Sequence, residues 1–381
     1  MESRIRIRPI DKDISVSKEE LRAVLGSALP VRTFPRRSSV GEKNFSHIIG
    51  TPAFDLFPFK NESPVIISMG QCNLAQKAIK DVRGRKIMIR MLKDEYRAMV
   101  KALADLKIHF RVLNLQEGDK EIGRWLTESG FKNVRFAATK PTRWQVFPRD
   151  VFVYLKAKKT LLVHSQLIKL RATRFGDCDV FHTSLAEGGR MLVSGDRLIL
   201  GRHPEASNRS GEARVLRFLR KKGMKIAKIP LALFYQISRI GRGNRLALFY
   251  DHHIDRSASL LRGKNGGYHL VLDPGYRTGP LTNPLPVKES LDLVRMACEK
   301  IEVRVHVPKS IHVPYATSLV QFSHGKVLAT GGDDELLATI EEIVGIGNLH
   351  ITEVPVVAYP VFASAGLHCL ITENPEPLID R

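Results

Sequence analysis

The chain has 381 residues, of which 43% are hydrophobic, and this is enough apolar material for a large buried core. Its 60 lysine and arginine side chains outnumber the 39 aspartate and glutamate side chains, which gives a formal net charge of +21 at pH 7. The length excludes a peptide or a small disulfide scaffold. The charge, taken alone, favours a nucleic acid or another acidic surface as partner.

The cysteines and the hydropathy indicate an intracellular protein. The four cysteines have neither the paired spacing of a zinc site nor the density of a secreted scaffold, so we expect free thiols in a reducing compartment. The first residues lack the apolar core of a signal peptide, and no apolar run reaches the ~18 residues of a membrane-spanning helix. We therefore expect a soluble, cytoplasmic protein with no membrane contact.

The N-terminal region differs in composition from the rest of the chain. Residues 1–62 mix charge, proline and serine without sustained periodicity, which is typical of an extended or loosely packed leader. From Ser63 onward, runs with strand and helix periodicity alternate. We expect residues 63–381 to form a single folded domain.

Within that domain the pattern predicts strands and helices in a recurring order. The first unit is a strand, a second strand, a helix and a third strand, at Pro64–Met69, Lys86–Met91, Asp94–Ala104 and Ile108–Leu113. Further strands are predicted at Val151–Leu155, Thr160–His164, Arg190–Val193, Leu198–Gly201, Leu246–Tyr250, His269–Leu272, Val303–Val307, Ser318–Phe322, Lys326–Ala329, Ile351–Val357 and Cys369–Thr372. Further helices are predicted at Glu212–Lys222, Val287–Ile301 and Asp333–Val344.

These elements group into about five α/β modules that repeat in architecture and not in sequence. Each module exposes one hydrophobic face and must stack on its neighbours, and a closed ring with the helices outside satisfies all of them. Polar residues that follow the strands would then converge near the axis of the ring.

Four segments fit that expectation, because each places polar residues or glycines at a strand end or a turn: Trp144–Asp150, Leu185–Gly189, Asp251–Asp255 and Ser364–Cys369. Each of them alone is a weak signal, since an Arg-Asp pair is usually a surface ion pair and Glu-Gly-Gly is usually a turn. Their order along one chain makes them a set.

The series Arg-Asp, Glu-Gly-Gly, His-x-Asp and Gly-x-His-Cys resembles the guanidino-group-modifying superfamily of arginine deiminases, agmatine deiminases, dimethylarginine hydrolases and amidinotransferases. The resemblance covers roughly residues 63–375 and implies a pentein-type catalytic domain, an α/β fold built as a five-bladed propeller of strand-strand-helix-strand modules. Two positions depart from the pattern. Arg190 follows Glu-Gly-Gly where deiminases carry Asn or Asp, and Ser364-Ala365-Gly366 stands where two adjacent glycines are usual.

The chemistry of a guanidinium matches these residues. The group is planar and permanently charged, so its site needs carboxylates that accept pairs of hydrogen bonds, and Asp150 and Asp255 are the candidates. Its carbon is a poor electrophile and calls for a cysteine thiolate, for which Cys369 is placed. A buried structural thiol is the alternative for Cys369, and the remaining cysteines are expected to be structural.

A general acid and base is also required, to protonate the departing amine and then to activate water. His253 is the candidate, because it lies two residues from Asp255 and both side chains would point to one side of a strand; His252 is the rival. Glu187 would orient His253. The resemblance implies that Arg209 binds the substrate carboxylate, with Arg190, Arg171 and Arg174 as alternatives.

No cofactor or metal is expected. The Asp251–Asp255 segment offers histidine and aspartate, but no second cluster has ligand spacing. The favoured function is a hydrolase of a guanidino compound, arginine or a relative, which gives a ureido product and ammonia through a covalent thiouronium on the cysteine.

Two other functions stay open. An amidinotransferase would pass the amidino group to an amine. A non-enzymatic protein would contact RNA or the ribosome through the basic run Arg214–Lys228, which otherwise is an amphipathic helix with Val215, Leu216, Phe218 and Leu219 toward the core. Nucleic acid is thus a secondary partner, and the pattern does not address oligomeric state.

Overall fold

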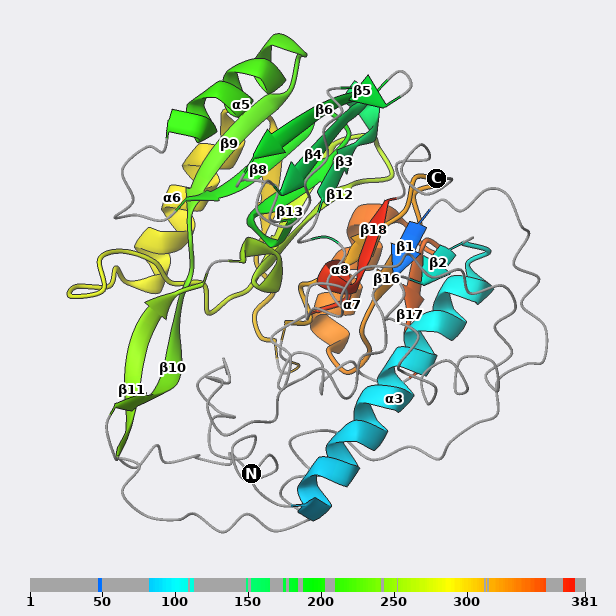
Figure 1. Cartoon of the computed structure of the whole chain (residues 1–381), viewed down its shortest axis with the longest axis vertical. Coiled ribbons are helices and arrows are strands. Elements are labelled where there is room, and N and C mark those ends of the chain that lie inside the picture. The colour runs from blue at the N-terminus through cyan, green and yellow to red at the C-terminus, as the bar shows by residue number, and fades with distance from the viewer. Residues whose placement is uncertain are drawn as a thin grey trace.

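Figure 1 shows the computed structural model of the chain, a mixed α/β structure as expected. The structure describes residues 47–49, 82–108, 110–112, 149, 152–164, 174–175, 178–183, 188–202, 210–240, 243–251, 253–311, 313, 315–353 and 366–373.

One pairing pattern recurs in five small sheets of the described chain: a strand pairs antiparallel with a second strand, which pairs parallel with a third. The first two of these sheets contain β3 (Phe152–Leu155), β4 (Thr160–His164), β5 (Arg174–Phe175) and β6 (Cys178–Thr183), and then β7 (Met191–Ser194), β8 (Arg197–Arg202) and β9 (Lys225–Pro230). The next two contain β12 (Ala258–Arg262), β13 (Tyr268–Leu272) and β14 (Val303–His306), and then β15 (Val320–Gln321), β16 (Val327–Ala329) and β17 (Leu349–Ile351).

The fifth sheet joins distant parts of the chain. In it, β1 (His47–Ile49) lies between β18 (Ile371–Glu373) and β2 (Phe110–Val112). The strand β1 belongs to residues 1–62, so this part of the predicted leader contributes a strand to the fold. A separate hairpin is formed by β10 (Leu233–Ile240) and β11 (Gly243–Tyr250), and it projects from one side of the molecule (Figure 1).

Helices make the crossovers that parallel pairing requires. Four helices lie in the chain between parallel partners: α3 (Val82–Asp105), α5 (Ser210–Lys221), α6 (Val287–Glu299) and α7 (Asp334–Val344). Figure 1 shows α5 and α6 along one side of the molecule and α3 along the opposite side. None of the helices that the structure describes has the length and apolar character to cross a membrane.

The apolar core is divided among the modules. Helix α5 buries Val215, Leu216 and Leu219 against β3, β4, β7 and β8, while Phe218 is partly buried against the same cluster. This is the amphipathic arrangement predicted for the basic run. Similar clusters lie beneath α6 and beneath α7.

A single cavity of about 600 Å³ is lined by residues from one strand of each of the five sheets, namely β3, β7, β12, β15 and β18. In every sheet this is the strand that pairs antiparallel with the second strand. The described sheets remain separate, and none of them closes on itself.

Two predicted elements were wrong, and the strand expected at Ile351–Val357 is displaced, because β17 ends at Ile351 and residues 354–357 lie outside the described residues. The strand expected at Lys86–Met91 is part of α3, which runs back from the predicted helix to Val82. No glycine or proline lies between Arg85 and Asp105, so the sequence contains no break that would separate Lys86–Met91 from the helix that follows. Cys369, expected in a strand, lies in the short helix α8 (Leu367–Leu370), and the strand begins at Ile371. The strand predicted at Pro64–Met69 lies outside the described residues.

Candidate active site

Three of the four motif segments meet in short helical turns. The turns are η4 (Gly188–Arg190), η5 (Ile254–Arg256) and α8, and η4 contacts both of the others. The fourth segment joins them at Arg149, because a Cβ on Gly188 would lie only 2.2 Å from the carbonyl oxygen of Arg149. Segments more than 200 residues apart in sequence therefore converge.

The second glycine of Glu-Gly-Gly lies directly against His253. A Cβ on Gly189 would lie 2.1 Å from His253 Nδ1, which is closer than any side-chain atom can approach. The motif therefore needs glycine at this position, since the backbone of η4 forms the surface against which the imidazole ring packs.

Asp255 is the centre of the site. Its side chain is fully buried, and its Oδ2 accepts a hydrogen bond from the Cys369 thiol at 3.1 Å and lies 2.9 Å from His368 Nδ1. Its Oδ1 is 3.9 Å from His253 Nδ1, which is too far for a hydrogen bond. Within the described part of the chain, no hydrogen-bond donor reaches Oδ1. A buried carboxylate oxygen in that position is able to accept a hydrogen bond from a ligand.

The charges of these groups follow from their contacts. Burial by itself would raise the pKa of Asp255, but the hydrogen bond and charge of His368, together with the charge of His253 and the Cys369 hydrogen bond, lower it to about 2. Burial and the nearby Arg149 lower the pKa of His368 to about 4 against the opposing effect of Asp255. At neutral pH the site thus holds an aspartate anion and a neutral His368, whose Nδ1–H donates to that anion.

A buried ion pair positions His253. The backbone N–H of His253 donates to Asp251 Oδ1 at 3.0 Å, and Arg256 Nη1 lies 3.1 Å from the same oxygen. Burial raises the pKa of Asp251, although the charge of Arg256 acts in the opposite direction. The Arg256 guanidinium lies 5.7 Å from the centre of the Tyr315 ring. This network fixes the backbone on which His253 and Asp255 are carried.

The turn that carries Cys369 is fixed from behind by Ser318. The backbone N–H of His368 donates to Ser318 Oγ at 3.2 Å, and a Cβ on Gly366 would lie 2.1 Å from Ser318 Cβ. The one glycine that this chain retains before the cysteine therefore makes the close backbone approach.

The other described cysteines lie in different surroundings. Cys178 and Cys298 are free and buried, as Cys369 is. Burial raises the pKa of Cys298 to about 12, so this thiol stays protonated. Cys178 Sγ lies 3.6 Å from the Tyr154 hydroxyl. Only Cys369, among these three, donates to a buried carboxylate, and a nitrogen of the His253 ring lies within 4.8 Å of its sulfur.

The structure brings together Cys369, His253 and Asp255, and their catalytic roles stay predictions. Three further predicted residues, Glu187, Asp150 and Arg209, lie outside the described residues. The same is true of the alternatives His252 and Arg171, and Arg174 is described only in its backbone. Arg190 Nη2 donates to the carbonyl oxygen of Gly201 at 3.4 Å.

Sequence reasoning missed two residues of the candidate site, His368 and Ser318. His368 stood in the quoted motif beside Cys369, and its place next to the predicted nucleophile was a signal that could have marked it. Ser318 carries no such signal, because its contact with His368 joins residues 50 positions apart.

Among the described residues, one set of atoms could hold a metal ion. The ligand atoms of His253, Asp255 and Cys369 lie within 4.8 Å of one another. A nitrogen, an oxygen and a sulfur ligand suit Zn²⁺. These are the same atoms that the guanidino chemistry would use, so a bound metal and a guanidinium would compete for them.

Comparison with known proteins found no matching protein-family model and no matching curated protein. Among solved structures, the chain is similar to a dimethylarginine dimethylaminohydrolase adduct with S-methyl-L-thiocitrulline (TM-score 0.48, 14% identity, 87% of this chain and 99% of that chain). It is also similar to the enzyme of that name from Pseudomonas aeruginosa complexed with citrulline (TM-score 0.47, 14% identity, 87% and 100%). A third is the N-terminal domain of ArgZ, a cyanobacterial arginine dihydrolase (TM-score 0.47, 10% identity, 87% and 98%). These proteins belong to the superfamily that the motif series resembles.

Proposed function

We propose that the protein hydrolyses a guanidino compound in the manner of an arginine deiminase, through a covalent intermediate on Cys369. The observation that carries this proposal is the arrangement at Asp255: one buried oxygen contacts the thiol, and the other has no donor among the described residues. A guanidinium that donates to Oδ1 would lie beside the sulfur.

The proposed substrate position follows from hydrogen-bonding geometry. A guanidinium presents paired N–H donors in one plane, which suits Asp255 together with a second carboxylate, for which Asp150 is proposed. Arg209 is proposed to bind the substrate carboxylate. If this holds, arginine is preferred over agmatine, which lacks that group.

The aspartate next to Cys369 also explains when the nucleophile would form. An ionised Asp255 at 3.1 Å favours the thiol, which donates to it, and disfavours a thiolate of like charge. A bound guanidinium adds a positive charge and reverses that balance. Substrate binding is therefore proposed to help generate the thiolate.

The proposed reaction has two stages. His253 takes the thiol proton, the thiolate forms a C–S bond with the guanidinium carbon, and His253 passes that proton to the amine as the C–N bond breaks, which releases ammonia and leaves a thiouronium. His253 then takes a proton from water, and the hydroxide adds to the same carbon. The C–S bond breaks to release the ureido product, the hydroxyl proton is lost to solvent, and His253 returns its proton to the sulfur. Glu187 is proposed to orient His253.

We also propose that the five sheets are the blades of one α/β propeller. The cavity lined by one strand of each sheet supports this arrangement, as do the contacts of β12 with β7 and β15 and of β18 with β3. In such a ring the turns η4, η5 and α8 would lie around the axis.

The test is a panel of guanidino compounds, namely arginine, agmatine, methylated arginine and peptidyl arginine, scored for ureido product and ammonia. We expect turnover of at least one of them, and a loss of about a thousandfold or more in Cys369→Ala. Cys178→Ala is the matched control, because it removes a buried thiol outside the site.

Mass spectrometry of the protein during turnover should detect the thiouronium adduct on Cys369. The proposal is wrong if no guanidine is turned over or trapped on Cys369. A new guanidino product upon addition of glycine or lysine would instead indicate an amidinotransferase.

A further inference from the structure

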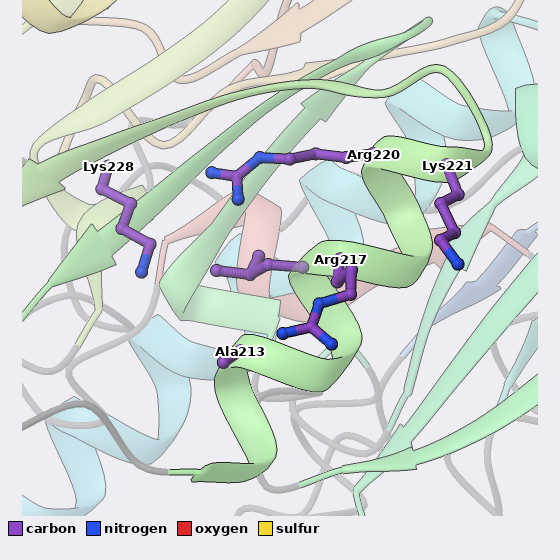
Figure 2. A pocket seen from close by; sticks show the side chains of 6 residues that line it. Ala213, Arg217, Arg220, Lys221 and Lys228 are labelled. Carbon is purple, nitrogen blue, oxygen red and sulfur yellow. The ribbon is translucent and has the colours of Figure 1, made fainter.

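A basic hollow lies on the outer side of the second module, between α5 and β9. It has a volume of about 500 Å³ and is lined by Ala213, Leu216, Arg217, Arg220, Lys221 and Lys228. Figure 2 shows Arg217 and Arg220 extending from successive turns of α5 and Lys228 extending from β9. Four of the six lining side chains are therefore cations, and two separate elements supply them.

The cations of the hollow are incompletely neutralised. Lys228 pairs with Glu212 at 2.8 Å, and outside the hollow Lys225 pairs with Glu302 at 2.6 Å. Arg217, Arg220 and Lys221 form no ion pair within the described part of the chain. Like charges three or four residues apart on a helix repel one another, so this face of α5 gains stability when an anion occupies it.

The helix cannot turn these charges elsewhere. Its apolar face buries Val215 and Leu219 in the core, and the buried Leu216 lies at the boundary between that face and the hollow, whereas Arg214, Arg217 and Arg220 are exposed. Burial of the apolar face therefore holds the basic face toward solvent. The face is a fixed feature of the fold.

We propose that this face of α5, together with Lys228 of β9, is a docking surface for the phosphate backbone of single-stranded RNA. Arg214, Arg217 and Arg220 follow one another at three-residue steps, each about 4.5 Å along the helix axis. A row of cations is complementary to the repeating charges of a phosphate polymer, and the guanidinium fork binds phosphate oxygens in pairs. None of the described residues that line the hollow is aromatic, so the hollow itself would contact phosphates and not bases. At the end of the row, Arg214 lies over the Phe181 ring, 5.9 Å from its centroid.

The surface is less suited to a membrane. Interfacial helices place large apolar side chains beside their basic residues. The exposed large hydrophobic side chains of the described chain are Val287, Leu293, Met296, Ile346 and Ile351, and none of them belongs to α5 or β9.

RNA binding here would be separate from the guanidino chemistry. Figure 1 places α5 at the outer edge of the molecule, away from α8, which carries Cys369. The two proposals therefore stand or fall independently, and the binding assay uses no guanidino substrate.

The experiment measures fluorescence anisotropy of a labelled single-stranded RNA of about 20 nucleotides, which is enough to span the site of an RNA-binding domain. The full-length protein is titrated at several NaCl concentrations between about 50 and 200 mM, the range over which phosphate contacts are strongly weakened. The variants are Arg217→Glu/Arg220→Glu and the milder Arg217→Gln/Arg220→Gln. The control Lys107→Glu/Lys264→Glu makes the same change in net charge at exposed positions outside the hollow.

We expect the wild type to bind, and the charge-reversed variant to bind at least about tenfold more weakly, with a salt slope smaller by about 0.7 for each lost contact. The glutamine variant should lie between them, and the control should bind like the wild type. Circular dichroism establishes that each variant is folded.

The proposal is overturned if the wild type does not bind RNA, or if the control loses as much affinity as the α5 variant. It is also overturned if the α5 variant loses binding to ATP or to phosphatidylserine vesicles but keeps its affinity for RNA.

Discussion

His368 connects two features of the molecule, because its ring contacts the buried carboxylate of Asp255 and also lines the cavity that the five strands share. Its position next to Cys369 in the sequence could have identified His368 as a residue of the candidate site. No sequence signal marks the ion pair of Asp251 with Arg256, because its role depends on the hydrogen bond from the His253 backbone to Asp251, which forms only in the folded protein. The sequence could therefore predict residues that meet in the candidate site, and could not predict which residues hold them in place.

The burial of His368 makes protein stability depend on pH. The pKa of a histidine is about 6.5 in an unfolded chain, whereas burial lowers that of His368 to about 4 in the folded protein. Between these two values the unfolded state binds more protons than the folded state. The free energy of unfolding should therefore fall as the pH falls from about 6.5 to about 4, with a slope from this group of at most about 1.4 kcal/mol per pH unit.

The measurement is urea unfolding of the wild type and of His368→Asn across that pH range. The variant should show a shallower slope, because asparagine can donate to Asp255 but does not titrate. His324→Asn is the control, since His324 is exposed. An unchanged slope in His368→Asn would show that other groups cause the acid sensitivity.

Local signals were sufficient for some elements. The strands predicted at Arg190–Val193 and Leu198–Gly201 are β7 and β8, and Gly195 in the tight turn between them has a positive φ of +55°, which glycine adopts readily. The helix expected at Asp333–Val344 is α7 almost to the residue. In both cases the pattern and its boundary residues agree over a short stretch of chain.

Other elements depend on partners that the local pattern does not contain. The strand β12 was not predicted, although Ala258, Leu260 and Leu261 are buried in it, because an apolar run of this length fits a helix or a strand equally well. Its antiparallel pairing with β13 decides between them. The same limit explains the error at Lys86–Met91, where a short apolar run was taken for a strand and belongs to α3.

The apolar face of α5 should carry its stability, and the basic face should not. Leu219 is 1% exposed within the cluster that α5 shares with β4, β7 and β8. Leu219→Ala leaves a cavity there and should lower the free energy of unfolding by about 2 to 5 kcal/mol. Arg217→Ala, two residues earlier on the exposed face, should change it by less than about 0.5 kcal/mol. Chemical denaturation measures both, and equal effects would contradict the assigned faces.

The folded structure shows where part of the net charge of +21 lies. A cationic substrate gains nothing from a basic exterior, and the proposed guanidino site relies on buried carboxylates. The basic row on α5 contains part of this excess, and it is the surface proposed to bind a partner. Composition alone suggested a partner of this kind, and the fold was needed to separate that surface from the proposed catalytic site.

At the largest scale, the strand β1 holds together the beginning and the end of the described chain. It pairs with β18, which directly follows the turn that carries Cys369, and with β2 on its other edge.

Removal of residues 1–62 deletes β1 and leaves both neighbours without their shared partner. Removal of residues 1–45 keeps β1. We expect the longer deletion to lower the melting temperature and to abolish guanidine turnover, at a cost of about 2 kcal/mol or more in lost strand pairing. The shorter deletion should keep both properties close to those of the full chain. Thermal unfolding followed by circular dichroism, with the turnover assay beside it, distinguishes the two; if the proteins lacking 1–45 and 1–62 behave alike, residues 1–62 are a dispensable leader and the folded domain begins at Ser63.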